Sequence, residues 1–157
     1  MEDKITKYSL VKLNTSLLPD YKDFERVNDD WNVEKHLNFN YDVDTAIAFS
    51  KLFFPTFIEY KKCIILESRF NESIFNNWFI KFNGDIAQVE KMCNLYETKD
   101  FFHINSTNQS IEKNLELGQQ LKVSWELNLK SLFPNRDMKV YLFIQDDNYY
   151  ITFYGNY

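Results

Sequence analysis

The sequence predicts an α+β fold, in which about five helices pack on a small, mostly antiparallel sheet of roughly three to four strands. Three observations support this prediction. Apolar residues recur at helical spacing in several segments, a β-branched and aromatic run lies near the middle of the chain, and two alternating apolar runs flank a polar turn near its end. No linker-like segment divides the 157 residues, so we expect a single domain over residues 1–157.

The first part of the chain is predicted to contain a tail, a short strand and an acidic helix. Residues 1–7 are expected to form a flexible tail, and the β-prone residues 8–13 (YSLVKL) suit an edge strand. A helix is expected over residues 19–30, because Pro19 suits a first helical turn and apolar residues follow at near-helical spacing: Tyr21, Phe24, Val27 and Trp31. Acidic side chains fill most of the outer face of this helix.

Residues 42–66 (DVDTAIAFSKLFFPTFIEYKKCIIL) form the most apolar stretch of the chain. Asp42 or Asp44 can cap a helix by accepting a backbone N–H. The helix that follows is apolar on more than one stripe, which predicts burial on several sides, and Pro55 ends it. Residues 57–66 then have the composition of a strand that is covered on both faces.

A helical hairpin is predicted over residues 72–97. Asn71 precedes its first apolar-periodic segment, and Asn83-Gly84 ends that segment, since glycine readily adopts the positive φ of a helix C-terminus. Asp85 then has Gln88 at capping-box spacing, which indicates the start of a second helix.

A longer helix is predicted over residues 110–132, followed by a β-hairpin at the C-terminal end. Gly118 interrupts the helix and indicates either a kink or close packing. The hairpin is predicted from the alternating runs 138–144 and 149–154, which flank Asp146, Asp147 and Asn148.

Charge and composition restrict the partners and the cellular location expected for this protein. The net charge is −5, with −4 of it in residues 1–50, and no basic cluster occurs, so nucleic acid is not an expected partner. No segment has the apolar length of a signal peptide or a membrane span, so we expect a cytoplasmic protein without membrane contact. Cys63 and Cys93 are expected to be buried free thiols. The Asn-, Lys- and Ile-rich composition is typical of an AT-rich bacterial genome.

The signatures of cofactor and metal sites are missing from the sequence. Only three glycines occur, too few for a phosphate-binding loop or a dinucleotide fingerprint, so no cofactor is expected. The two histidines and two cysteines do not cluster, so no metal site is expected either.

If the chain is an enzyme, the candidate residues are His103, Glu59 and Glu67. His103 lies in a predicted loop and has a side chain suited to acid–base chemistry, although stacking on its aromatic neighbours is the simpler interpretation. Glu59 and Glu67 lie near the two ends of the central run, too far apart along one strand to act as a pair. His36 is expected in solvent.

Two surfaces are candidates for binding a partner. The acidic helix presents Asp20, Asp23, Asp29 and Asp30, which could meet a basic protein, although acidic helix faces usually only aid solubility. The last strand presents Tyr149, Tyr150 and Tyr154, and tyrosine is enriched at interfaces. We expect that strand to lie at a sheet edge, where it could add to a partner's strand or form a homodimer.

These observations leave three hypotheses of function. The leading one is a protein-binding module of the immunity or antitoxin type, which neutralises or docks a basic protein. The second is a small hydrolase-like enzyme with a cleft near His103. The third is a homo-oligomeric structural protein assembled through the C-terminal hairpin.

Overall fold

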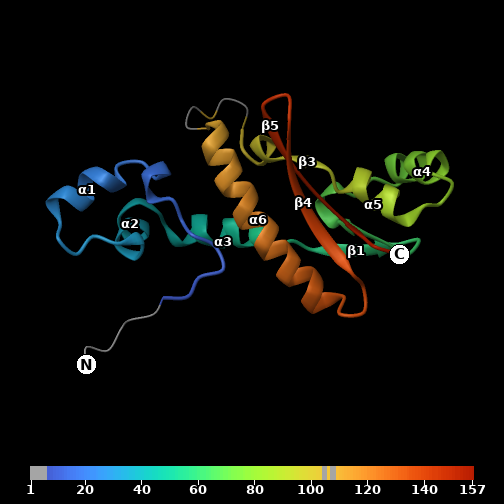
Figure 1. Cartoon of the computed structure of the whole chain (residues 1–157), viewed down its shortest axis with the longest axis horizontal. Coiled ribbons are helices and arrows are strands. Elements are labelled where there is room, and N and C mark those ends of the chain that lie inside the picture. Colours follow the sequence, from blue (N-terminus) through green and yellow to red (C-terminus); the bar gives the residue numbers. More distant parts are fainter. Residues whose placement is uncertain (1–6, 104–105, 107–108) are drawn as a thin grey trace.

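The computed structural model describes residues 7–103, 106 and 109–157, and this part of the chain contains six α-helices and five strands. The strands form two antiparallel sheets, one with the order β1-β2 and one with the order β3-β5-β4 (Figure 1). The α+β class is confirmed, although the strands divide between two sheets instead of one. The predicted tail lies outside the described residues, except for Lys7.

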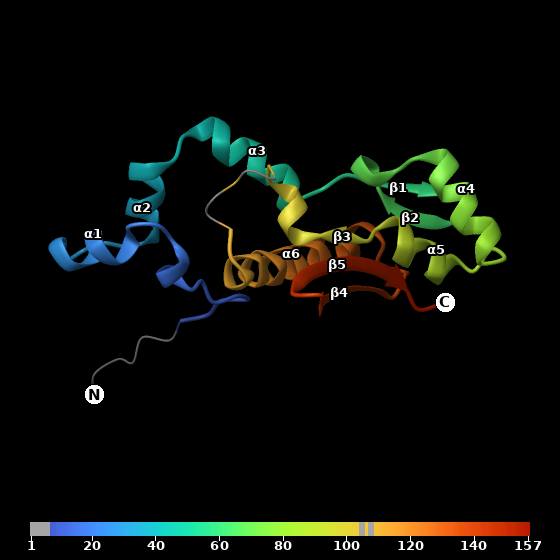
Figure 2. The same cartoon turned by 90° about the horizontal axis from the view of Figure 1, so that it is seen from above.

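Three helices extend to one side of the strands: α1 (Tyr21–Val27), α2 (Val33–Asn40) and α3 (Val43–Phe53), preceded by the 3-10 turn η1 (Thr15–Leu17). Figures 1 and 2 show α1 and α2 far from the strands in both views. We call residues 14–54 the arm and residues 55–157 the body.

The arm differs from its prediction in two places. Residues 8–13 are not a strand, and the predicted helix over 19–30 is shorter. It ends because Asn28 leaves the helical region, at φ −134° and ψ 108°, and its side-chain amide donates to the Phe24 carbonyl at 2.9 Å. Helices α2 and α3 are capped by side chains close in sequence to the N–H groups that they bind. The Asn32 side chain accepts from Lys35 N–H, and the Asp42 side chain accepts from Thr45 N–H.

Helix α3 is not buried, contrary to prediction. None of its residues is buried, and Val43 and Ile47 are 73% and 63% exposed. The second half of α3 contacts the body, where Trp125 Nε1 donates to Leu52 O at 2.9 Å and Asn128 Nδ2 donates to Phe53 O at 3.1 Å. The Phe49 ring also lies 6.0 Å from the Phe102 ring. An apolar helix surface requires a covering element, and the described chain provides none along most of α3.

The predicted central strand is a hairpin of two strands, β1 (Phe57–Tyr60) and β2 (Cys63–Leu66). Lys61 and Lys62 both have positive φ, 47° and 68°, which is the backbone of a tight two-residue hairpin turn. Neither residue is a typical turn former, so the sequence contains no signal for this turn. All four β2 residues are buried, which confirms that this strand is covered on both faces.

The predicted helical hairpin is confirmed as α4 (Glu72–Lys81) and α5 (Ile86–Cys93). Asn71 accepts from Ile74 N–H, and Asp85 accepts from Gln88 N–H. Gly84, at φ 77°, ends α4 with its N–H bonded to Phe79 O at 2.9 Å. The 3-10 turn η2 (Glu67–Arg69) precedes α4. The short strand β3 (Tyr96–Glu97) follows α5 and is followed in turn by the 3-10 turn η3 (Thr98–Phe101).

Helix α6 (Ile111–Leu132) packs on the C-terminal hairpin of β4 (Met138–Gln145) and β5 (Asn148–Gly155). Both were predicted. Asp146 and Asp147 form the hairpin turn with φ of 48° and 60°. Gly118 allows close packing, because a Cβ there would lie 2.6 Å from Leu142 Cδ1.

The core consists of two clusters that meet at β2. Ile64 and Leu66 point to a cluster with α6 and the C-terminal hairpin, while Cys63 and Ile65 point to a cluster with α4 and α5. Burial raises the pKa of the Cys63 thiol to about 12 and that of the Cys93 thiol to about 11. Both cysteines are therefore buried thiols, as expected.

Candidate protein-binding surface

Residues 14–44 of the arm carry the whole net charge of the protein. Residues 14–44 contain eight acidic and three basic side chains, and the other residues of the chain contain fifteen of each. Asp20, Asp23, Asp29 and Asp30 all lie in this segment and are exposed. The structure therefore brings the four predicted acidic residues onto one protruding part of the molecule (Figure 1).

Three ion pairs use all three basic side chains of residues 14–44. Arg26 pairs with Asp23 at 3.2 Å and Lys22 with Glu25 at 2.7 Å, while Lys35 pairs with Asp30 and lowers the pKa of that carboxyl by a hydrogen bond. Five acidic side chains have no ion pair among the described residues: Asp20, Asp29, Glu34, Asp42 and Asp44. Of the four predicted residues, Asp20 and Asp29 are thus the uncompensated ones.

Aromatic rings hold α1 and α2 together. Phe24 stacks on Trp31 with ring centroids 4.9 Å apart, and His36 lies 5.3 Å from the Tyr21 ring. His36 is 1% exposed, contrary to the expectation of a solvated side chain, because these rings enclose it. The indole N–H of Trp31 and Nε2 of His36 are buried without a hydrogen-bond partner in the described structure. Each unsatisfied group costs about 1–3 kcal/mol, so the small core of the arm is weakly stabilised.

Large apolar side chains are also exposed in the arm. They are 38–78% exposed and come from all three arm helices and the residues that follow them: Val27, Leu37, Phe39, Tyr41, Val43, Ile47, Phe49 and Phe54. Where such side chains adjoin, an exposed apolar area is typical of a surface that another molecule covers. We call these eight side chains the apolar arm surface. This surface is not predicted from the sequence, because the same apolar pattern predicts a buried helix.

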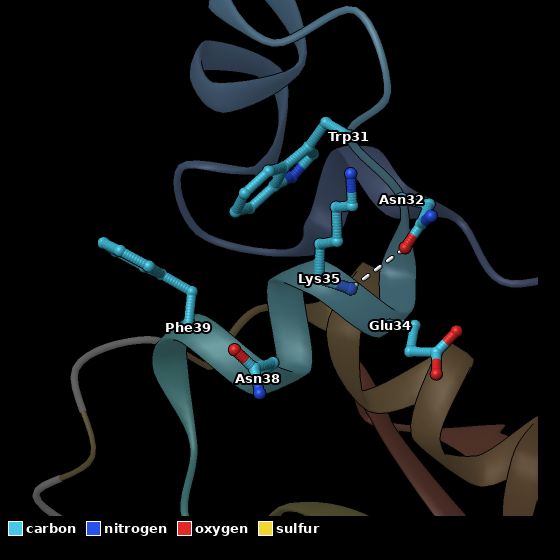
Figure 3. A pocket seen from close by; sticks show the side chains of 6 residues that line it. All are labelled: Trp31, Asn32, Glu34, Lys35, Asn38 and Phe39. Carbon is cyan, nitrogen blue, oxygen red and sulfur yellow. Dashed lines mark hydrogen bonds between the residues drawn. The ribbon is translucent and has the colours of Figure 1, made fainter.

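A pocket of about 490 Å³ opens on α2 within this region. Figure 3 shows the Phe39 and Trp31 rings to the left of the Lys35 side chain, while Glu34 points away from both rings. Trp31 and Phe39 meet edge-to-face at 6.3 Å. Such a pocket fits one apolar or aromatic side chain of a partner, the kind of residue that anchors many interfaces.

The tyrosines of the last strand are less available than predicted. Tyr149, Tyr150 and Tyr154 are all half-buried, and Tyr154 stacks on Tyr141 at 4.4 Å. The strand that carries them, β5, is the central strand of its sheet and not an edge, because β3 and β4 flank it. Addition of a partner strand to β5 is therefore blocked, and the open edge of this hairpin is β4.

The structure does not bring Glu59 and Glu67 together. Glu59 lies opposite Ile64 near the closed end of the β1–β2 hairpin, where Arg136 binds its carboxylate at 2.7 Å. Glu67 follows the other end of β2 and is exposed. His103 is exposed in the segment between η3 and α6. The two glutamates therefore provide no paired carboxylate site.

The described part of the chain holds no group of three or more His, Cys, Asp or Glu side chains that could bind a metal ion. Of its helices, none is both long and apolar enough to cross a membrane. Comparison of the chain with family models, curated proteins and solved structures found no match.

Proposed function

We propose that this chain is a protein-binding module of the immunity or antitoxin type, which neutralises or docks a basic protein through its arm. The observation that supports the proposal is the coincidence of two features in one protruding segment. Five uncompensated carboxylates and the apolar arm surface both belong to residues 20–54. Complementary charge accelerates association with a basic partner, while buried apolar anchors supply most of the binding free energy.

The net negative charge of residues 14–44 favours a basic protein as the partner over a second copy of the chain. A symmetric dimer formed through the arm would bring two identical surfaces into contact, each with a net charge of −5 in residues 14–44. Like charges across an interface oppose association. A basic protein meets the same apolar side chains without this repulsion.

The homo-oligomer hypothesis has one specific observation in its favour, the open edge of β4. Phe143 and Ile144 on this strand are exposed, and an edge strand can pair with a second copy. Light scattering at tens of micromolar protein would detect such a dimer. The hydrolase hypothesis stays a prediction, and no described contact favours it, since Arg136 already binds Glu59.

The test is capture of a partner from the native host with two charge-matched variants. The arm variant combines Asp20→Asn, Asp29→Asn and Asp44→Asn, and the body variant combines Glu67→Gln, Asp100→Asn and Glu112→Gln, so both change the net charge from −5 to −2. All six side chains are exposed and lack an ion pair among the described residues.

The proposal predicts a stoichiometric basic protein that the native chain and the body variant retain and the arm variant releases at the same ionic strength. Equal retention by both variants would contradict binding through the arm. A neutral or acidic partner, or no stoichiometric partner, would contradict the choice of a basic one.

A further inference from the structure

A second pocket, of about 350 Å³, lies where the arm joins the body. Its walls come from the end of α3, from η2 after β2, from the β3–η3 segment and from α6. Its volume is within the range of small-molecule sites, about 300–1,000 Å³. It is separate from the apolar arm surface and does not depend on the proposed function.

The apolar part of this pocket is held in place by mutual contacts. Tyr96 and Phe101 stack with ring centroids 4.2 Å apart, and Phe101 meets Trp125 edge-to-face at 6.3 Å. The indole N–H of Trp125 is already used, because it donates to Leu52 O at 2.9 Å. A ligand therefore meets a preformed aromatic wall with no unsatisfied indole donor.

Two cations line the same pocket, and no acidic side chain does. The Arg69 guanidinium lies 4.5 Å from the centroid of the Tyr96 ring and donates through Nη2 to Leu95 O at 3.2 Å. These contacts orient the guanidinium and leave its other N–H groups available. Neither Arg69 nor Lys51 forms an ion pair with any described carboxylate.

Neighbouring carboxylates do not supply the missing anion. Glu67 and Asp100 adjoin lining residues in sequence, but neither lines the pocket. Glu97 is paired with Lys99 at 2.6 Å. The pocket thus combines an aromatic wall with two cations that form no ion pair with a carboxylate of residues 7–103, 106 or 109–157.

We propose that this pocket binds a small aromatic carboxylate. The ring of the ligand would pack mainly against Tyr96 and Phe101, since Trp125 is only 1% exposed. Its carboxylate would accept hydrogen bonds from Arg69 with Lys51 nearby. A planar carboxylate suits the fork of N–H donors on a guanidinium. A charged oxygen pair also gives Arg69 the anionic partner that the described chain does not provide.

The probe for this proposal is 3-phenylpropionate, with 3-phenylpropanol as a neutral ligand of nearly the same shape. Both are titrated into the full chain, and binding is followed by ¹H–¹⁵N spectra. We expect saturable shifts at the Ser68 and Tyr96 amides and at the Trp125 indole N–H, with a dissociation constant of about 1 mM for a ligand of this size. The alcohol should bind about tenfold more weakly, since it lacks the charge that faces the two cations.

Three variants make the result specific. Arg69→Gln and Lys51→Gln should each weaken binding of the carboxylate about threefold to tenfold, whereas Lys130→Gln, at an exposed position on α6, should leave it unchanged. Unchanged spectra outside the pocket verify that each variant is folded. Equal binding of acid and alcohol, shifts confined to the apolar arm surface, or no saturation with the carboxylate would each overturn the proposal.

Discussion

Glu90 lies on α5 and Asn94 caps the C-terminus of that helix one turn later, and their side chains bind the backbones of strands from both sheets. Glu90 accepts from Ile64 N–H of β2 and from Gly155 N–H of β5, each at 2.8 Å. Asn94 accepts from Leu66 N–H at 2.9 Å and donates to Phe153 O at 3.3 Å. The two sheets are not paired with each other, so these side chains satisfy backbone groups that a neighbouring strand would otherwise bind.

Removal of the Glu90 carboxylate is predicted to destabilise the fold strongly. Glu90→Ala leaves Ile64 N–H, Gly155 N–H and the Tyr157 hydroxyl, which donates to Glu90 at 2.7 Å, without their acceptor. We expect the free energy of unfolding to fall by about 3–5 kcal/mol, because buried donors lose both protein and water partners. Urea unfolding followed by circular dichroism measures this change.

The control is Glu67→Ala, which removes an exposed carboxylate and should change the free energy of unfolding by less than about 0.5 kcal/mol. Similar losses for the two variants would show that the hydrogen bonds of Glu90 contribute little.

The same carboxyl group predicts a pH dependence of stability. Burial raises the pKa of Glu90 above the ordinary value of 4.5, although its hydrogen bonds and Arg136 oppose that shift. The folded state therefore binds a proton more tightly than the unfolded state does. The resulting stability is fully present below pH 4.5 and is lost as the pH rises through the raised pKa.

Comparison with Glu90→Gln isolates this effect from the other carboxylates. In urea titrations at a series of pH values, the stability of the native chain relative to the variant should fall as the pH rises above 4.5 and then level off. A difference that is constant with pH, or that grows, would contradict a raised pKa.

Gly118 provides a packing prediction. Alanine is favoured over glycine in a helix interior by about 1 kcal/mol, but its Cβ would lie 2.6 Å from Leu142 Cδ1. We expect Gly118→Ala to lower the free energy of unfolding by about 1–2 kcal/mol, since the crowded side chain must move. In the double variant with Leu142→Ala this crowding disappears, so the glycine replacement should become neutral or stabilising there. Additive losses in the double-mutant cycle would exclude the contact as the cause.

Helices with local signals could be predicted from the sequence. Asn71 and Asp85 cap α4 and α5 through side chains that lie close in sequence to the N–H groups they bind. The Asp146-Asp147 turn likewise lies between two runs whose alternation indicates strands. In each case the residues that cause the structure are neighbours along the chain.

Features that depend on distant partners could not be predicted. Lys61 and Lys62 adopt positive φ because the packed strands on either side impose the turn, and neither residue favours it by itself. Glu90 looks like an ordinary helical glutamate until the strands at Ile64 and Gly155 are placed beside it. The exposure of α3 is of the same kind, because an apolar pattern indicates a surface to be covered but does not identify what covers it.

The exposure of α3 leads to the last prediction. Ile47→Ala and Val43→Ala remove side chains that are mostly in solvent, so each should change the free energy of unfolding by less than about 0.5 kcal/mol. Leu129→Ala on α6, where the side chain is fully buried, should lower it by about 2–5 kcal/mol. Urea unfolding of the three variants under one condition gives the comparison.

Ile47→Ala and Val43→Ala also show whether these side chains contribute to binding of a partner or to stability of the isolated chain. If the apolar arm surface contacts a basic partner, Ile47→Ala and Val43→Ala should together weaken that complex about tenfold or more while the isolated chain unfolds as before. Isothermal titration with the captured partner measures the loss. Destabilisation of the isolated chain by about 2 kcal/mol would instead indicate that α3 is buried in solution, as its apolar sequence alone predicts.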